Sequence, residues 1–270
     1  MVGIGPLFFL FLRITLLKCE MEGRAVIEDV AKITDFPHSV YLYVECSTDK
    51  IWACGASILN QWMILTAAQC LVNCRFKNTK FNHTVIIGAG SEDITEMEII
   101  STCIDAILHE RFNKWVGEND IAIAFVDKEI PLGDNMKKVL ITNTFENKPL
   151  SGYVAGWGTT GDEEDDKLHS CFQKIRSMNA CNYAHYLYLP PGMFCAGDLL
   201  NAKNIPRTVP LDSGSAFIYK TFYQIGVVSY GTNKYPSLTF YTNVSYFYSW
   251  INENTKRLYC RNTANKIKRN

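Results

Sequence analysis

The stretch Trp62–Cys70, WMILTAAQC, joins an apolar run to a turn of small residues that ends in a cysteine. Its last residue before that cysteine, Gln69, carries a neutral amide. An amide offers lone pairs and two N–H donors, but it has no accessible pKa near neutrality. Gln69 can therefore hold a neighbouring group by hydrogen bonding, but it cannot take a proton from a hydroxyl group and pass it to a leaving amine.

Seven short segments, in the same order and at similar separations, resemble segments of the trypsin-like (chymotrypsin-fold) serine proteases. The first is Trp62–Cys70, where that family has Ala-Ala-His-Cys at the end of the turn. The others are Asn119–Ala122 (NDIA), Gly156–Gly158 (GWG), Met193–Gly197 (MFCAG), Leu211–Gly214 (LDSG), Val228–Gly231 (VSYG) and Trp250–Ile251 (WI). The resemblance covers roughly residues 24–254, and it implies an all-β fold of two packed six-stranded antiparallel barrels with a C-terminal helix.

The resemblance places Gln69 at the general base, Asp120 at the carboxylate that orients the base, and Ser213 at the nucleophile. A serine hydroxyl is a poor nucleophile until a base takes its proton, and losing that base costs such an assembly about a millionfold in turnover. The resemblance therefore implies a protease scaffold without protease activity. The alternative is a weakly active or unusual serine endopeptidase, for which another histidine would have to supply the base: His38, His83, His109, His169 or His185.

Other positions also depart from the family pattern. Leu211 replaces the glycine whose N–H, with that of Ser213, lines the oxyanion hole. Arg207 stands at the base of the specificity pocket, with Ser229 and Gly231 on its wall. A cation there would favour an acidic group, unless Arg207 turns outward or is paired in a collapsed pocket, because a buried unpaired charge is costly.

The segment Arg24–Glu28, RAVIE, takes the place of the family's activation sequence. Cleavage after Arg24 would free the amine of Ala25, which could then pair with Asp212. However, Ile27 and Glu28 replace the two glycines of the segment that inserts after cleavage. Arg24 is therefore either an activation site or an ordinary surface arginine.

Ten cysteines indicate an oxidising compartment. The resemblance implies the disulfides Cys54–Cys70 and Cys181–Cys195. The same fold would bring Cys46 beside Cys74 and would let Cys103–Cys260 tie the first barrel to the terminal helix, which leaves Cys19 and Cys171 without assigned partners. The sequence has no tight Cys-x-x-Cys or His-x-x-x-His cluster, so we expect no metal site and no cofactor.

Short β-rich runs separated by Gly, Asn and Asp must position these side chains. The expected strands are Val40–Val44, Ile51–Ile58, Val85–Ile87, Ala106–Leu108, Ile121–Phe125, Val154–Trp157, Phe217–Tyr219, Gln224–Tyr230 and Leu238–Thr242. The first two flank Ser47–Lys50, which predicts a hairpin. Two helices are expected, Ser177–Tyr186 and Val244–Asn254, the second from apolar residues at helical spacing.

The apolar run Pro6–Leu17, bounded by Lys18, resembles a signal-peptide core, although an uncleaved membrane-associated segment is the alternative. We expect a signal peptide over 1–19, a short extension over 20–24, the protease-like domain over 25–256 and a basic tail over 257–270. The tail is either a frayed terminus or a segment that attracts an acidic partner. The sequons at Asn82 and Asn243 predict a glycoprotein.

Lys plus Arg and Asp plus Glu number 27 each, so bulk charge indicates neither a nucleic-acid partner nor, once the signal peptide is removed, a membrane partner. The expected function is that of a secreted protease homologue that binds protein: a protease, a protease substrate or an inhibitor. By family analogy, it would act as a regulator or cofactor in an extracellular protease cascade, in immunity or in seminal fluid.

Overall fold

The computed structural model describes residues 29–47, 50–72, 74, 84–144, 149–158, 166–185, 188–200, 208 and 212–267. The predictions for the signal peptide, the short extension and several single residues lie outside these ranges. Those residues are Arg24, Ala25, Asn82, His83, Arg207 and Leu211.

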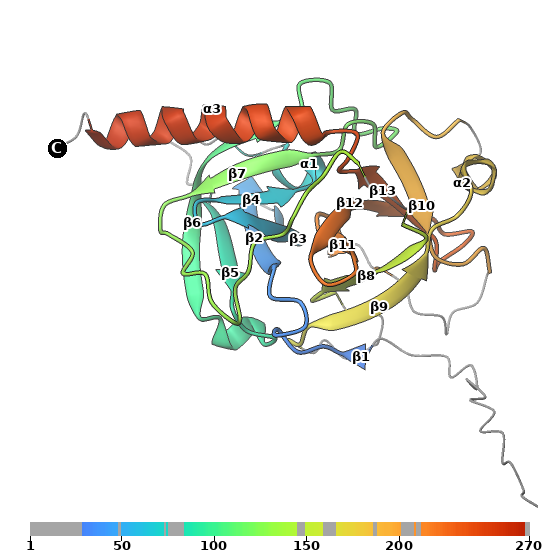
Figure 1. The fold of residues 1–270 in the computed structure, drawn as a ribbon, viewed down its shortest axis with the longest axis horizontal. Helices are drawn as coiled ribbons and strands as arrows, with labels where there is room; N and C mark the ends of the chain where they lie inside the picture. The colour runs from blue at the N-terminus through green and yellow to red at the C-terminus, as the bar shows by residue number, and fades with distance from the viewer. Residues whose placement is uncertain are drawn as a thin grey trace, which may run out of the picture.

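The first half of the chain forms a closed antiparallel barrel with strand order β2-β3-β4-β7-β6-β5 (Figure 1). Its strands are β2 (Ser39–Ser47), β3 (Lys50–Asn60), β4 (Met63–Thr66), β5 (Thr84–Ala89), β6 (Ile99–Leu108) and β7 (Ala122–Val126). The predicted hairpin is confirmed, because β2 pairs with β3 up to Ser47 and Lys50. Every side chain of β4 and β7 is buried, which explains why both strands read as unbroken apolar runs.

The second half forms a sheet with strand order β1-β9-β8-β11-β12-β13-β10. Its strands are β1 (Asp29–Val30), β8 (Ser151–Gly156), β9 (His169–Lys174), β10 (Met193–Ala196), β11 (Ala216–Tyr219), β12 (Tyr223–Gly231) and β13 (Thr239–Asn243). A bridge between Ile175 and Ala196 links the end of β9 to β10, so the six strands β8 to β13 curl into a second barrel and β1 is added at its edge. The rings of Phe194, Phe217 and Tyr241 pack together in its interior.

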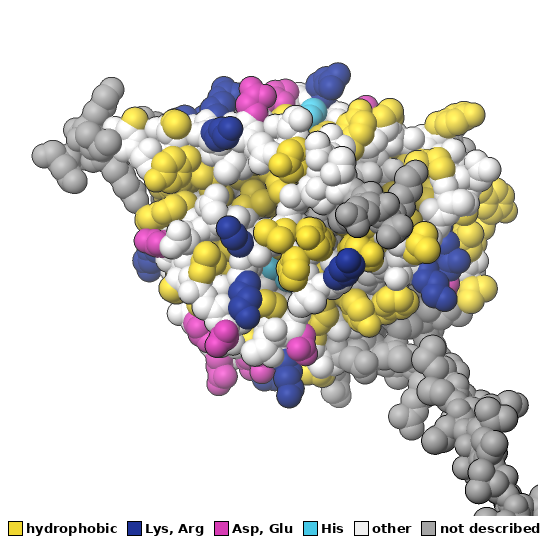
Figure 2. Space-filling model, viewed as in Figure 1, with side chains coloured by type: hydrophobic (Ala, Val, Ile, Leu, Met, Phe, Trp, Pro, Cys, Tyr) yellow, Lys and Arg dark blue, Asp and Glu magenta, His cyan; other side chains and the backbone are white. Residues whose placement is uncertain are grey.

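The described helices are α1 (Ala68–Leu71), α2 (Met178–His185), α3 (Tyr248–Ile267) and the 3-10 turn η1 (Ile94–Glu96). None of these helices is long and apolar enough to cross a membrane. The face in Figure 2 mixes hydrophobic side chains with lysine and arginine, while acidic side chains gather near its edges.

The prediction for the C-terminal helix and tail was wrong in its boundaries. Asn243 Oδ1 accepts a hydrogen bond from the Ser245 N–H at 3.0 Å, so a turn precedes the helix, which begins at Tyr248. The helix then runs through the expected tail to Ile267 and lies along the first barrel (Figure 1). Leu258 is fully buried in that barrel's core, and Arg261 Nε lies 2.6 Å from Asp105 Oδ2 on β6. These contacts hold the tail in place.

Two disulfides, Cys54–Cys70 and Cys181–Cys195, join described residues, and Cys74 is also disulfide-bonded. Its expected partner, the Cys46 side chain, lies outside the described part. The expected Cys103–Cys260 bond is wrong, because both residues are free thiols. Cys103 is buried in the barrel, whereas Cys260 is on the exposed side of α3, and the Arg261–Asp105 ion pair anchors the helix instead.

Candidate functional site

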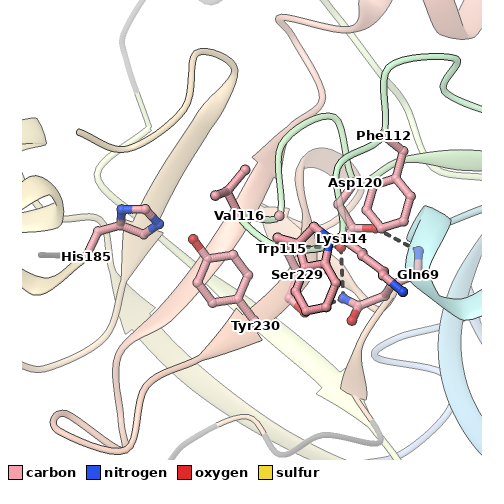
Figure 3. Close-up of a pocket in the computed structure, with 10 residues that line it drawn as sticks. Gln69, Phe112, Lys114, Trp115, Val116, Asp120, His185, Ser229 and Tyr230 are labelled. Atoms are coloured by element: carbon pink, nitrogen blue, oxygen red, sulfur yellow. Dashed lines mark hydrogen bonds between the residues drawn. The ribbon is translucent and has the colours of Figure 1, made fainter. Parts of the chain in front are cut away.

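The site lies where the two barrels meet, and each contributes side chains to it (Figure 3). The buried strand β4 leads through Ala67 and Ala68, both fully buried, into the short helix α1 that carries Gln69. Asp120 lies two residues before the start of β7. Asn119 precedes it with a φ of 56°, and its side-chain amide donates to the Arg111 carbonyl at 2.9 Å. Left-handed backbone at a non-glycine residue is uncommon, and here it turns Asp120 toward the interior.

Gln69 is fixed by three hydrogen bonds. Its backbone N–H donates to Asp120 Oδ1 at 2.9 Å, and its side-chain Nε2 donates to Asp120 Oδ2 at 2.8 Å. Nε2 also donates to the Ser229 carbonyl at 2.5 Å. The side-chain amide therefore donates its N–H groups to the Asp120 carboxylate and to the neighbouring strand. This arrangement preserves the geometry expected of a triad without supplying a base.

Asp120 is 1% exposed. Besides the bonds from Gln69, its Oδ2 accepts a hydrogen bond from Ser229 Oγ at 2.6 Å, and its backbone carbonyl accepts one from Thr242 Oγ1 at 2.8 Å. Burial raises the pKa of Asp120 to about 6, and the hydrogen bonds from Ser229 and Gln69 limit the rise. Among the described residues, the hydrogen-bond donors to this carboxylate come from Gln69 and Ser229, which are both neutral.

Ser213 is half-buried in the turn before β11. Its carbonyl accepts the Gly55 N–H at 2.8 Å, which ties it to the first barrel. Gly214 follows with a φ of 91°, and a Cβ there would lie 2.2 Å from the Gly55 carbonyl oxygen, so only glycine fits. The Ser213 hydroxyl donates to the Ser229 carbonyl at 3.4 Å, a long contact, and makes no hydrogen bond with Gln69.

The described histidines have other environments. His38 is buried next to Phe36. His109 packs against Phe247, just before α3, and against Trp250 in α3. His169 lines a small cavity beside Asp212, and His185 on α2 packs against Tyr230 and Phe240. No hydrogen bond joins any of these four to the Ser213 hydroxyl.

The structure places Ser229 and Gly231 close together on β12, whereas Arg207, expected at the base of the specificity pocket, lies outside the described residues. Gly231 faces Thr239 across the β12–β13 pair. Thr239 is fully buried, and its hydroxyl lies 2.6 Å from the hydroxyl of Thr208, the residue after Arg207. The Thr239 hydroxyl also accepts a hydrogen bond from Nε2 of the buried Gln173 at 3.4 Å. Sequence reasoning missed Thr208 and Thr239, because only the strand pairing places Thr239 opposite Gly231.

An open cavity of about 180 Å³ lies beside Tyr230 and Gln69. It is lined by Gln69, Phe112, Lys114, Trp115, Val116, Gly117, Asp120, His185, Ser229 and Tyr230 (Figure 3). Gly117 has a φ of 68°, and a Cβ at this position would lie 2.3 Å from Tyr230 Cε1. Glycine thus allows the 112–118 loop to pack directly on the Tyr230 ring. No periodic pattern of residues predicted this loop.

Asp212 is 5% exposed. Its Oδ1 accepts the Gly158 N–H at 3.2 Å, and a Cβ on Gly156 would lie 2.2 Å from the same oxygen.

Asn243, the second predicted glycosylation site, uses its Oδ1 in the turn before α3. Within the described ranges, no group of three or more His, Cys, Asp or Glu side chains is arranged to hold a metal ion.

A pair of β-barrels with aspartate and serine at their seam defines the chymotrypsin-fold serine proteases and their homologues. Residues 26–251 match the family model for Trypsin, and the chain belongs to this family.

Its curated relatives include duodenase-1 of Bos taurus, 27% identical over 242 residues that cover 87% of this chain and 90% of the relative. Mast cell protease 3 of Ovis aries is 28% identical over 258 residues, with coverages of 93% and 96%. Transmembrane protease serine 11A of Homo sapiens is 27% identical over 219 residues, and the matched region is 77% of this chain but only 50% of that relative. The chain thus spans about half the length of that relative.

Solved structures confirm the fold. HL collagenase superposes with a TM-score of 0.74 at 20% identity, covering 85% of this chain and 97% of that one. The scabies mite inactivated protease paralogue S-D1 superposes with a TM-score of 0.70 at 21% identity, with the same coverages.

Proposed function

We propose that this chain is a secreted, non-catalytic member of the trypsin family that acts by binding protein. One observation carries the proposal: Gln69 occupies the general-base position and commits its N–H groups to Asp120 and to the Ser229 carbonyl. An amide in this place holds Asp120 and Ser229 by hydrogen bonds, but it cannot accept a proton from the Ser213 hydroxyl near neutral pH.

The expected loss of turnover is too large for residual proteolysis to account for the function of this chain. Removing the base of a serine–histidine–aspartate unit costs about six orders of magnitude in turnover, nearly as much as removing all three groups. Asp120 does not compensate, because its oxygens face Gln69 and Ser229 while the Ser213 hydroxyl points to a backbone carbonyl.

The interaction surface, by contrast, is retained. The cavity beside Gln69 remains open, and the strand β12 still ends at Ser229–Gly231 beside it. We propose that this former substrate cleft binds a protease, a protease substrate or an inhibitor, and so regulates an extracellular protease cascade. Secretion is supported by the two disulfides, which persist in oxidising compartments, and by the apolar run at residues 6–17.

A fluorophosphonate probe tests the lack of catalysis, because it labels only serines activated by a base. The protein purified from the medium of secreting cells should be labelled no faster than its own Ser213→Ala variant, with trypsin as the positive control. Labelling of Ser213 at a rate near that of trypsin would refute the proposal and restore the serine endopeptidase interpretation.

A further inference from the structure

The outer face of the second barrel carries a row of aromatic side chains that the fold leaves half uncovered. Tyr153 on β8 and Phe172 on β9 lie opposite each other in the strand pair, and their ring centres are 5.1 Å apart. These two side chains are 45% and 48% exposed. The Phe36 ring, whose centre is 6.3 Å from that of Tyr153, extends the row. Because the strands hold the rings in place, this surface is already ordered before any partner arrives.

The pattern along β9 indicates that folding does not require this exposure. Position 172 points outward and holds a phenylalanine, whereas position 173 points inward and holds a buried glutamine. A polar residue would serve the outer face of such a strand at least as well, because an exposed ring buries little apolar area. A contiguous group of exposed rings, unlike a single exposed apolar residue, is typical of an interaction site.

Exposed lysines flank the rings. Lys174 lies two residues beyond Phe172 on the same face of β9. Lys138 precedes Val139, whose side chain packs against β11, the strand next to β8. Neither lysine forms an ion pair with a described residue. The strands β8, β9 and β11 contain no Asp or Glu, so no carboxylate of these strands offsets the two positive charges.

Acidic side chains at the margin of the row have cations of their own. Asp134 pairs with Lys137 at 3.6 Å. Asp35, next to Phe36, lies in one turn with Lys32, whose carbonyl accepts the Asp35 N–H at 3.0 Å. The surface therefore keeps the positive charge of the two flanking lysines, which attracts carboxylates.

We infer that this outer face, defined by Phe36, Tyr153, Phe172, Lys138 and Lys174, docks a protein partner that presents carboxylates around an apolar centre. The rings provide the desolvated centre of the interface, and the lysines provide its charged rim. A second copy of this chain is a poor occupant, because a two-fold contact would bring the same lysines together. A bilayer is also a poor occupant, because rings that lie half-buried on a sheet do not reach into its apolar layer.

The outer face is separate from the candidate site. None of its five residues lines the cavity beside Gln69. A partner on the outer face therefore does not need the cleft, and the chain can bridge two proteins. This inference goes beyond the proposed function and does not depend on it.

Acidic copolymers test the outer face. The full-length protein, purified from the medium of secreting cells, is titrated into fluorescently labelled poly(Glu,Tyr). The polymers poly(Glu) and poly(Lys,Tyr) each lack one of the two required features. We expect poly(Glu,Tyr) to bind about tenfold more tightly than poly(Glu), because only the copolymer covers the exposed rings, and poly(Lys,Tyr) to bind least. High salt should weaken the binding, because exposed charges are screened.

Two variants locate the binding, and each has a matched control. Phe172→Ser should lower the affinity for poly(Glu,Tyr) about tenfold, and Lys174→Glu should lower it about fivefold. Lys174→Glu changes an exposed side chain, so it keeps the test decisive even if Phe172→Ser weakens the sheet. The controls are Tyr188→Ser, which removes an exposed ring elsewhere, and Lys256→Glu, which reverses an exposed charge on α3. Both controls should bind as the wild type does.

The outcomes separate this inference from the proposed function. Equal binding of poly(Glu,Tyr) and poly(Glu), no binding of either, or equal losses in the control variants would each overturn the inference. Binding to vesicles of phosphatidylserine and phosphatidylcholine, lost in Phe172→Ser and without binding of poly(Glu,Tyr), would assign the face to a membrane and overturn it as well. The fluorophosphonate experiment reports on Ser213 alone, so either proposal can fail while the other stands.

Discussion

Gln69 and Asp120 form the centre of the site at the scale of single residues. A neutral imidazole presents one N–H donor and one acceptor, whereas the Gln69 amide turns N–H groups to both Asp120 and the Ser229 carbonyl. The Gln69 amide therefore satisfies the buried carboxylate, and an amide has no pKa near neutrality. Asp120 is left as a buried acid held by neutral donors, with its pKa raised to about 6.

This raised pKa has a measurable consequence. The native state binds a proton at Asp120 more tightly than the unfolded chain does, so this residue lowers stability as pH rises from about 4 to about 6. The full effect is about 3 kcal/mol. Asp120→Asn carries no charge, so its free energy of unfolding, measured in denaturant across this range, should lack the decline and should rise more steeply with pH than that of the wild type.

His38 has the opposite effect on the pH dependence of stability, and it therefore provides a control. Burial lowers the pKa of His38 to about 4, so its stabilising contribution is complete above its ordinary value of 6.5 and is lost as pH falls toward 4. In the wild type the two residues oppose each other. His38→Gln should therefore show a stability that falls with increasing pH over this interval. If Asp120→Asn and the wild type gave parallel curves, the raised pKa of Asp120 would be contradicted.

At the scale of elements, α3 shows how a charged tail becomes part of the fold. Its early turns bury Ile251 and Leu258 against the first barrel, and its later turns place Arg261 and Asn262 on Asp105 of β6. The Asp105 side chain is 4% exposed, so it depends on these partners. A buried carboxylate without a partner is costly, so the contacts of Arg261 and Asn262 with Asp105 stabilise the later turns of the helix.

Arg261→Ala should therefore destabilise the protein by about 2 kcal/mol, between the values for exposed and fully buried ion pairs. The measurement is the free energy of unfolding in denaturant at neutral pH. Lys256→Ala is the matched control, because Lys256 is an exposed cation on the same helix and its loss should change stability by less than about 0.5 kcal/mol. Equal effects of the two variants would show that the Arg261–Asp105 pair does not anchor the helix.

The strand β9 was not predicted from the sequence, and its residues show why. Its inward positions include Cys171 and Gln173, and Gln173 accepts a hydrogen bond from the Tyr241 hydroxyl at 2.7 Å while its outward neighbour Phe172 is 48% exposed. The usual alternation of apolar-in and polar-out is thus reversed in part. Only the partners across the barrel make the buried amide acceptable.

At the scale of the whole molecule, the two barrels meet through polar contacts as well as through the site. Ser57 Oγ on β3 donates to Gln224 Oε1 on β12 at 2.7 Å, and both side chains are buried. The site residues are therefore distributed over both barrels, and so are the departures from the protease pattern. In the sequence, the departures include Gln69, Leu211 and Arg207.

This distribution predicts the outcome of a reversion. Gln69→His should restore an imidazole beside Asp120, yet its kcat/KM on peptide substrates should stay at least about a hundredfold below that of trypsin. Leu211 keeps its backbone N–H, but it lacks the backbone freedom of the glycine that the family has there. We expect this N–H to be displaced from the oxyanion hole, and losing one oxyanion-hole donor costs about a hundredfold or more. The double variant Gln69→His with Ser213→Ala sets the background. Trypsin-like cleavage by the single revertant would show that the other changes matter little.

The sequence by itself determined the fold class, the two barrels, the Cys54–Cys70 and Cys181–Cys195 pairs, and the absence of a histidine at position 69. These features depend on local runs of apolar residues and on short motifs whose order along the chain is sufficient. Only the tertiary structure decided the Thr208–Thr239 contact, the orphan hydroxyl of Tyr230, the packing of Gly117 and the anchoring of α3. Each of these joins groups that are distant in sequence or unpaired in space, and their energies depend on burial and on partners that no local pattern encodes.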